Sequence, residues 1–158
     1  MHSKIFQVSL TPIEKEDFRG TDDFYENYSS FADYISKNIE GEDRDITIDH
    51  LANKFSAIFT RQGDALVYNG KVKNFVRKWY AHIKKCAREL SLTKMQDSIS
   101  LHRIKDAVDC THLDTSIRFY IEDWNGWAGP AKDLIDFIIN KMKKGDKLYV
   151  GGVVDYHY

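Results

Sequence analysis

The most regular hydrophobic pattern in the chain lies in residues 71–90. Its apolar positions recur at intervals of three and four residues, which is the spacing of one face of an α-helix. These positions are Val72, Phe75, Val76, Trp79, Ile83, Cys86, Ala87 and Leu90. The opposite side carries mostly lysine and arginine. The sequence therefore predicts a long helix over 71–90 that buries its apolar side around Trp79 and leaves a basic side in solvent.

Three other segments are predicted to be helical. Apolar residues at helical spacing predict an amphipathic helix over 22–38. A charged loop over 40–45 follows and leads into a short helix over 49–55. Pro130 suits the first position of a further helix, and Gly145 ends it.

Alternating or β-rich runs predict strands in most of the remaining chain. The runs are 5–10, 57–60, 65–68, 101–108, 117–122 and 148–156. The second and third runs flank Gly63-Asp64, which predicts a β-hairpin. Gly151-Gly152 interrupts the last run and predicts a bulge or a close approach of another backbone. Because that run is apolar for much of its length, we expect it in the middle of the sheet.

The order of these elements indicates an α+β fold. Strands do not alternate one for one with helices, which argues against a doubly wound parallel sheet. We expect a mixed or mostly antiparallel sheet of about five to six strands with three main helices packed on it. No linker or internal repeat divides the chain, so residues 1–158 are predicted to form a single domain.

Composition and charge exclude a disordered class. Hydrophobic residues make up 42% of the chain and charged residues 30%, as in ordinary globular proteins. The formal net charge of −1 gives the whole molecule no strong field to attract nucleic acid or an acidic membrane. The distribution is uneven, because acids dominate between Glu14 and Asp49 and bases dominate between Lys71 and Lys105.

The sequence carries no targeting or metal-binding signature. Its apolar runs are shorter than the roughly 18–20 residues that span a bilayer, and the N-terminus lacks the apolar core of a signal peptide. Cys86 and Cys110 are predicted to be free thiols in a reducing, cytoplasmic compartment. Neither the pair Cys110/His112 nor the pair Asp155/His157 has a zinc-site spacing. We therefore predict no metal, no cofactor and no membrane partner.

Both ends of the chain resemble one group of proteins. The segments that carry the resemblance are Lys4-Ile5-Phe6-Gln7-Val8 with Pro12-Ile13, Phe24-Tyr25, Ala32-Asp33-Tyr34, and residues 149–158. They are similar to a set of short bacterial proteins of gut anaerobes that have no assigned function. The resemblance implies a bacterial cytosolic protein and implies no activity.

The basic side of the helix over 71–90 is the first candidate binding surface. At 100° per residue, four cations share one stripe. They are Lys73, Arg77, Lys84 and Arg88. Such a stripe can bind phosphates, including those of nucleic acid. The alternative is a solvated face, or a face matched by the acidic segment 14–49, and the position of that segment relative to the helix discriminates between the two.

Trp124 and Trp127 are the second candidate. Together with Gly126 and Gly129 they lie just before a predicted helix N-terminus. Backbone N–H groups there can receive an anion, and the indoles can stack on a ring, a base or a partner protein. The alternative is that both indoles close one end of the hydrophobic core.

Three functional hypotheses remain. The first is a non-enzymatic interaction module that contacts a protein partner through a charged or aromatic surface, because the chain shows surface asymmetry but no assembled catalytic motif. The second is a nucleic-acid-associated domain that uses the basic face of the helix over 71–90. The third is a small enzyme whose site is assembled from residues distant in the sequence, with no catalytic residue assigned.

Overall fold

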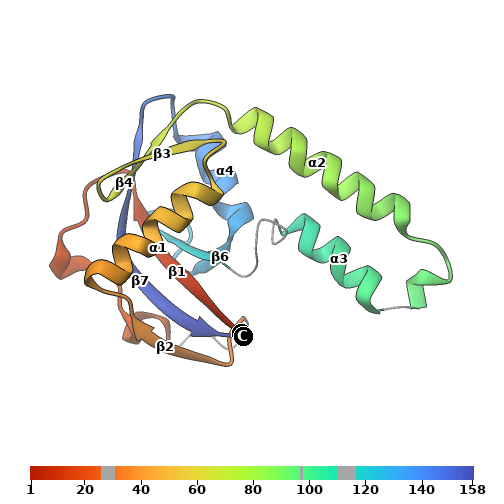
Figure 1. The fold of residues 1–158 in the computed structure, drawn as a ribbon, viewed down its shortest axis with the longest axis horizontal. Helices are drawn as coiled ribbons and strands as arrows, with labels where there is room; N and C mark the ends of the chain where they lie inside the picture. Colours follow the sequence, from red (N-terminus) through yellow and green to blue (C-terminus); the bar gives the residue numbers. More distant parts are fainter. Residues whose placement is uncertain (26–30, 97, 110–116) are drawn as a thin grey trace.

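A computed structural model describes residues 1–25, 31–96, 98–109 and 117–158. Within these ranges the chain forms one seven-stranded sheet and four α-helices (Figure 1). The strands are β1 (His2–Ser9), β2 (Tyr34–Asn38), β3 (Phe59–Gln62), β4 (Ala65–Tyr68), β5 (Arg118–Ile121), β6 (Ala128–Pro130) and β7 (Lys147–His157). The helices are α1 (Gly41–Lys54), α2 (Val72–Glu89), α3 (Ser98–Val108) and α4 (Ala131–Lys141), with short 3-10 turns η1 (Lys15–Asp17), η2 (Thr21–Phe24) and η4 (Lys94–Gln96). The α+β class is confirmed, with more strands than the five to six expected.

The C-terminal strand β7 lies at the centre of the sheet. It pairs antiparallel with β1, with β4 at its N-terminal end and with β2 at its C-terminal end. Beyond β1, β5 pairs in parallel and β6 pairs antiparallel with β5. The β3–β4 hairpin closes the opposite edge around Gly63, whose φ of 60° suits a tight two-residue turn. The predicted hairpin, the central last strand and the mostly antiparallel sheet are confirmed.

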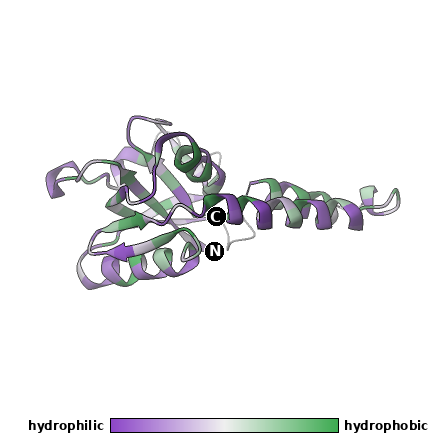
Figure 2. Cartoon of the chain, turned by 90° about the horizontal axis from the view of Figure 1, so that it is seen from above, coloured by the Kyte–Doolittle hydropathy of each residue, from purple (hydrophilic) through white to green (hydrophobic). Residues whose placement is uncertain are grey.

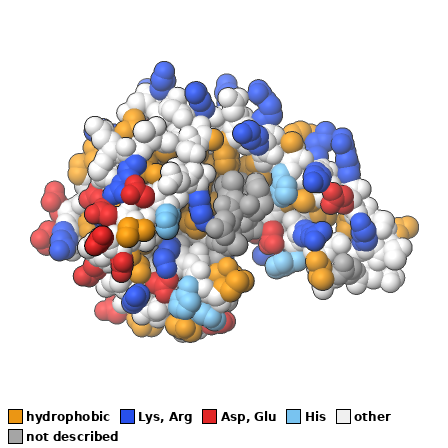
Figure 3. Space-filling view, viewed as in Figure 1, with side chains coloured by type: hydrophobic (Ala, Val, Ile, Leu, Met, Phe, Trp, Pro, Cys, Tyr) orange, Lys and Arg blue, Asp and Glu red, His pale blue; other side chains and the backbone are white. Residues whose placement is uncertain are grey.

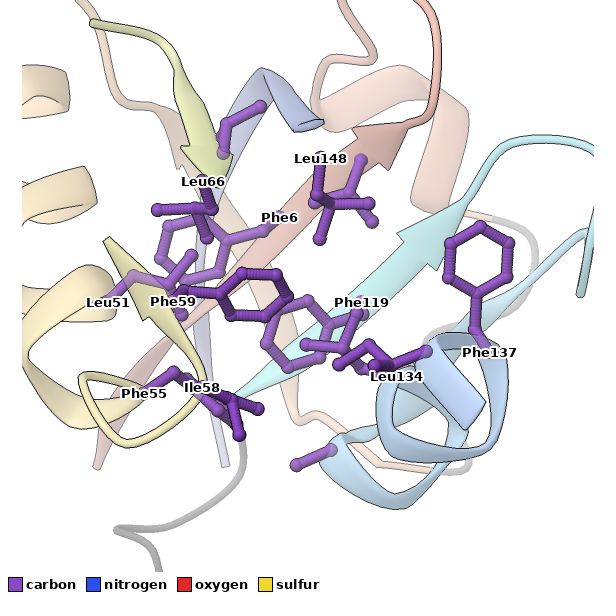
Figure 4. Close-up of a cluster of buried hydrophobic side chains, with 14 of the residues drawn as sticks. Phe6, Leu51, Phe55, Ile58, Phe59, Leu66, Phe119, Leu134, Phe137 and Leu148 are labelled. Atoms are coloured by element: carbon purple, nitrogen blue, oxygen red, sulfur yellow. The ribbon is translucent and has the colours of Figure 1, made fainter. Parts of the chain in front are cut away.

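Hydrophobic side chains cover both faces of the sheet. On one face α1 and α4 pack over β1, β5 and β7, and phenyl rings fill the space between them (Figure 4). The ring centroid of Phe119 lies 6.0 Å from that of Phe6 and 5.9 Å from that of Phe55. A smaller cluster forms on the other face, because successive side chains of a strand point to opposite sides. Its members are Ile5, Phe24, Ile35, Ala128, Val154 and Tyr156.

The pair Gly151-Gly152 in β7 permits two close approaches. The register of β1 and β7 shifts at this point, so that both glycines lie opposite Gln7. A Cβ on Gly152 would lie 2.0 Å from the carbonyl oxygen of Arg19. The amide of Gly152 donates to Oε1 of Gln7 at 2.8 Å, and the guanidinium of Arg44 donates to the carbonyl of Gly151 at 3.0 Å. The pair is therefore both a bulge and a site of close approach, as its sequence predicts.

The predicted helix over 22–38 is wrong. The 3-10 turn η2 ends at Phe24, and Tyr34–Asn38 form strand β2. Residues 26–30, in the middle of that prediction, lie outside the described residues. β7 extends past the end of β4 and leaves backbone donors and acceptors open there, and β2 satisfies them. This long-range pairing overrides the local helical spacing.

Two further predictions are wrong. Residues 40–45 are not a loop, because α1 begins at Gly41 and the acidic side chains of Glu42 and Asp43 fall in its first turn, where they stabilise the positive helix end. Residues 101–108 are not a strand but lie in α3. This segment packs against α2. A neighbouring helix offers side chains for packing and no open backbone groups for strand pairing.

The helices α2 and α3 form an arm that projects from the sheet (Figure 1, Figure 2). We call residues 71–108 the arm and the remaining described residues the body. The predicted helix over 71–90 is confirmed as α2. Only Val72 and Phe75 at its start are fully buried, whereas Trp79 is half-buried. The expectation that this helix packs along the sheet is therefore corrected: it enters the core at its base and then pairs with α3.

Candidate binding surface

Contacts at the base of the arm set the orientation of α2. The ring of Phe75 stacks on that of Phe55 in the body, with centroids 6.2 Å apart. One turn further along, Nε1 of Trp79 donates to the backbone carbonyl of Ala107 in α3. These contacts hold the apolar side of α2 against the body and α3. The opposite side of α2 is consequently turned to solvent.

That opposite side carries the four predicted cations. We call Lys73, Arg77, Lys84 and Arg88 the stripe, and all four are exposed. At 100° and 1.5 Å per residue they fall within about 60° of the helix circumference and cover about 22 Å of its length. The structure therefore brings together all four residues that the sequence singles out on this helix.

The stripe cations lack acidic partners in the described part of the chain. No described carboxylate forms an ion pair with any of the four. Arg77 instead donates to Oδ1 of Asn74 at 3.3 Å, and the ammonium of Lys84 lies 5.2 Å from the ring centroid of Tyr80. The positive charge of the stripe is thus available to an external anion.

The acidic segment 14–49 makes its ion pairs within the body. Arg61 of β3 contacts Asp45 at 2.8 Å and Asp49 at 2.7 Å. Arg19 contacts Asp23 at 2.9 Å. The described residues of this segment make no ion pair with the basic helix face.

Charge is separated between the arm and the rest of the chain. The arm contains ten lysines and arginines against three acids, a formal net charge of +7, and the rest contains thirteen against twenty-one, a net charge of −8. Blue side chains follow the arm in Figure 3, whereas red side chains gather at the opposite end of the molecule. The net charge of the whole chain is near zero, but the electrostatic potential at the arm is strongly positive, because surface potentials depend on how charge is distributed.

Tyr80 adds an aromatic ring to the edge of the stripe. Its side chain is 59% exposed. It follows Lys73 by seven residues and Arg77 by three, so it lies on the same side of α2. Sequence reasoning from the apolar face missed this residue. Its helical spacing to the cations is the signal that could have found it.

Trp124 and Trp127 pack on the body rather than on the arm. Trp124 makes an edge-to-face contact with Phe137 of α4, with centroids 5.5 Å apart, and the ammonium of Lys141 lies 5.7 Å from its ring. Trp127 lines a small cavity beside Phe24. Their exposed fractions are 39% and 44%. Both indoles are thus partly used in packing, and their role in binding stays a prediction.

A carboxyl group of the chain itself lies at the start of α4. Asp133 is in the first turn of α4. Its Oδ2 lies so close to Gly129 that a Cβ on this glycine would be only 2.0 Å from it. Burial raises the pKa of Asp133, while a hydrogen bond from Asn125 opposes the rise. The carboxyl group of Asp133 therefore lies next to the tryptophan loop at this helix end.

Polar side-chain contacts join β1 to β7 and join β7 to the residue that precedes β2. The carboxylate of Asp155 contacts Lys4 and lies 2.7 Å from Nδ1 of His2. Nδ1 of His157 lies 3.0 Å from the carboxylate of Asp33. Burial by itself raises the pKa of Asp155, but the hydrogen bonds and charges of Lys4 and His2 outweigh it and lower the pKa. These contacts fasten β1 and the residue before β2 to β7.

The described residues contain no group of three or more His, Cys, Asp or Glu side chains arranged to hold a metal ion. The predicted free thiol of Cys86 is confirmed as unbridged. Cys110 and His112 lie outside the described residues.

Two hollows of about 550 and 570 Å³ are both lined in part by Phe18. Their walls include Gln7 and Arg44, whose polar atoms bind the backbone of the β7 bulge. A hydrogen bond to Asp23 raises the pKa of Arg19, so this guanidinium remains a cation in an ion pair. The polar groups of Gln7, Arg44 and Arg19 are thus engaged in contacts within the protein. They give the small-enzyme hypothesis no candidate catalytic residue.

Comparisons with known proteins assign no family. No family model, curated protein or solved structure matches the chain. The resemblance to short bacterial proteins of gut anaerobes therefore stays a prediction. Among the helices that the structure describes, none combines the length and the apolar character needed to cross a bilayer.

Proposed function

We propose that this chain is a non-enzymatic interaction module of the bacterial cytosol that binds a negatively charged macromolecular partner through the stripe on α2. One observation carries the proposal: the four stripe cations are exposed on a projecting arm, and no described carboxylate neutralises them. Long cationic side chains that stay in water without partners contribute little to folding. A partner that supplies anions along about 22 Å would use all four.

Two classes of partner offer such a row of anions. The first is a protein with an acidic surface, which the charge separation of the chain would steer onto the arm and away from the body. The second is nucleic acid, whose backbone supplies regularly spaced phosphates. The second class is favoured by a specific observation, the exposed Tyr80 within the basic surface.

The proposal is tested by neutralising the stripe. A variant with Lys73, Arg77, Lys84 and Arg88 all changed to Gln is compared with the unaltered chain on heparin and on an acidic-protein resin, at low salt. We expect the unaltered chain to be retained on at least one of the two and the variant to elute at clearly lower salt, because each lost cation removes an ionic contact.

The matched control changes four exposed body lysines to Gln and therefore removes the same total charge. These lysines are Lys15, Lys37, Lys143 and Lys147. The control is expected to elute near the unaltered protein. Flow-through of the unaltered chain, or an equal loss of retention in both variants, would contradict the proposal.

A further inference from the structure

We infer that the stripe is a binding site for single-stranded nucleic acid, in which phosphates contact the cations and one unpaired base stacks on Tyr80. The inference rests on the proposed binding of a polyanion by the arm and specifies its chemistry. Proteins that hold single strands combine a basic track along the backbone with exposed aromatic rings on which bases stack. Both components are present on one side of α2.

The stripe provides the track. Its cations follow the helix axis over about 22 Å on one side of a single helix. The apolar face of α2 contacts α3 through Trp79 and Ala107, whereas the basic side is open to a ligand. The strongly negative rest of the chain repels a polyanion, which directs it to the arm.

Tyr80 provides the stacking surface. Its ring is 59% exposed, and the ammonium of Lys84 lies 5.2 Å from its centroid. Lys84 lies over one face of the ring, so a base that stacks on the opposite face brings its phosphate close to this cation. Tyr80 is a member of neither hydrophobic cluster that the described residues form.

The aromatic ring decides between a single strand and a duplex. In a duplex each base is stacked between its neighbours and shows only its edges in the grooves. An exposed aromatic ring on a helix cannot stack on the bases of a duplex. An unpaired base, in contrast, can stack its face on the ring. The combination of cations with Tyr80 therefore points to single strands.

The test is fluorescence anisotropy with a labelled 20-nucleotide oligothymidine and with a mixed-sequence duplex of the same length, at 50 mM salt. We expect tighter binding of the single strand. Tyr80→Ala should weaken single-strand binding by roughly 5- to 100-fold, which corresponds to the loss of one stacked base. It should leave duplex binding unchanged. Tyr80→Phe keeps the ring and should bind like the unaltered chain.

A second pair of variants tests the geometry on the same helix. Lys73→Gln with Lys84→Gln removes the two cations nearest Tyr80 in angle around the helix, whereas Lys78→Gln with Lys85→Gln removes two from the other flank. The first pair should weaken binding more and should reduce the salt slope of log K by about 1.4. Tyr80→Ala should leave that slope unchanged, because it removes no charge.

The outcomes separate the inference from the proposed function. Heparin retention combined with equal affinity for single strand and duplex, or with no effect of Tyr80→Ala, overturns the inference and leaves the proposed function standing. Binding to an acidic protein with no binding to either oligonucleotide has the same meaning. Absence of binding to every polyanion overturns both. Circular dichroism confirms that each variant is folded.

Discussion

Asp155 shows how one buried carboxylate is kept ionised. Its side chain is almost fully buried, which disfavours the charged form. Lys4 and His2 nevertheless lower its pKa by hydrogen bonding and charge. A carboxyl group with a lowered pKa in the folded state stabilises the protein at pH values above its unfolded pKa of about 3.9, and this contribution is lost as the pH falls through the folded pKa.

We therefore expect Asp155→Asn to reduce the free energy of unfolding at pH 7 by roughly 1–3 kcal/mol. The difference from the unaltered protein should shrink as the pH falls below about 4, where the unfolded chain takes up a proton first, and should vanish once the pH has passed the lowered folded pKa. Urea unfolding followed at pH 7 and at pH 2.5 provides the measurement. A difference of the same size at both pH values would show that the charge of Asp155 is not the cause.

Single residues differ in how much of their structural role the local sequence shows. Gly151-Gly152 is interpretable without a structure, because only a bulge or a crowded backbone explains two glycines within an apolar strand. Arg44 is not. In the sequence Arg44 is a single cation within an acidic run, but in the structure its guanidinium donates to the backbone carbonyls of the β7 bulge. The residues it meets lie more than 100 positions away, so no local pattern contains that information.

At the scale of elements, the arm depends on one helix pair. α3 is short, and isolated helices of its length are marginal in water. Its connection to α2 includes the hydrogen bond from Trp79 to the carbonyl of Ala107. Ala107 is completely buried.

Trp79→Phe retains an aromatic ring and removes this hydrogen bond. We expect the pairing of α3 with α2 to weaken by about 1 kcal/mol, which corresponds to roughly fivefold faster amide exchange in α3. Exchange in β1 and β7 should not change. Hydrogen exchange with mass spectrometry gives the measurement, and Tyr80→Phe is the control because that ring is exposed. Unchanged exchange in α3 would mean that the bond contributes nothing to the pair.

Two of the incorrect element predictions share one cause. Residues 22–38 and 101–108 both have apolar spacing compatible with two kinds of element. In each case the partner decided the outcome, since β7 provides an open strand edge for β2 and α2 provides a helix surface for α3. The long helix was predictable because its pattern repeats over five turns, which leaves no competing interpretation.

At the scale of the whole molecule, stability is unevenly distributed. The body has two hydrophobic clusters around a central strand, whereas the arm beyond Phe75 relies on its own helix pair. Segments with few buried contacts open first.

Limited trypsin digestion is therefore expected to cut first in the distal arm, among Lys84, Lys85, Arg88 and Lys94. The exposed body lysines Lys143 and Lys147, next to the central strand, should be cut much later. Mass spectrometry of early fragments identifies the order. First cuts at the body lysines would contradict this ranking of local stability.

The sequence by itself determined the α+β class, the hairpin, the central last strand and the long helix with its basic stripe. Each of these follows from local periodicity or from backbone chemistry at a glycine. Only the tertiary structure decided that α2 leaves the core after its first turns, that the acidic segment pairs within the body, and that the stripe stays uncovered beside Tyr80. These outcomes depend on contacts between segments far apart in the chain, and one-dimensional patterns carry no distances.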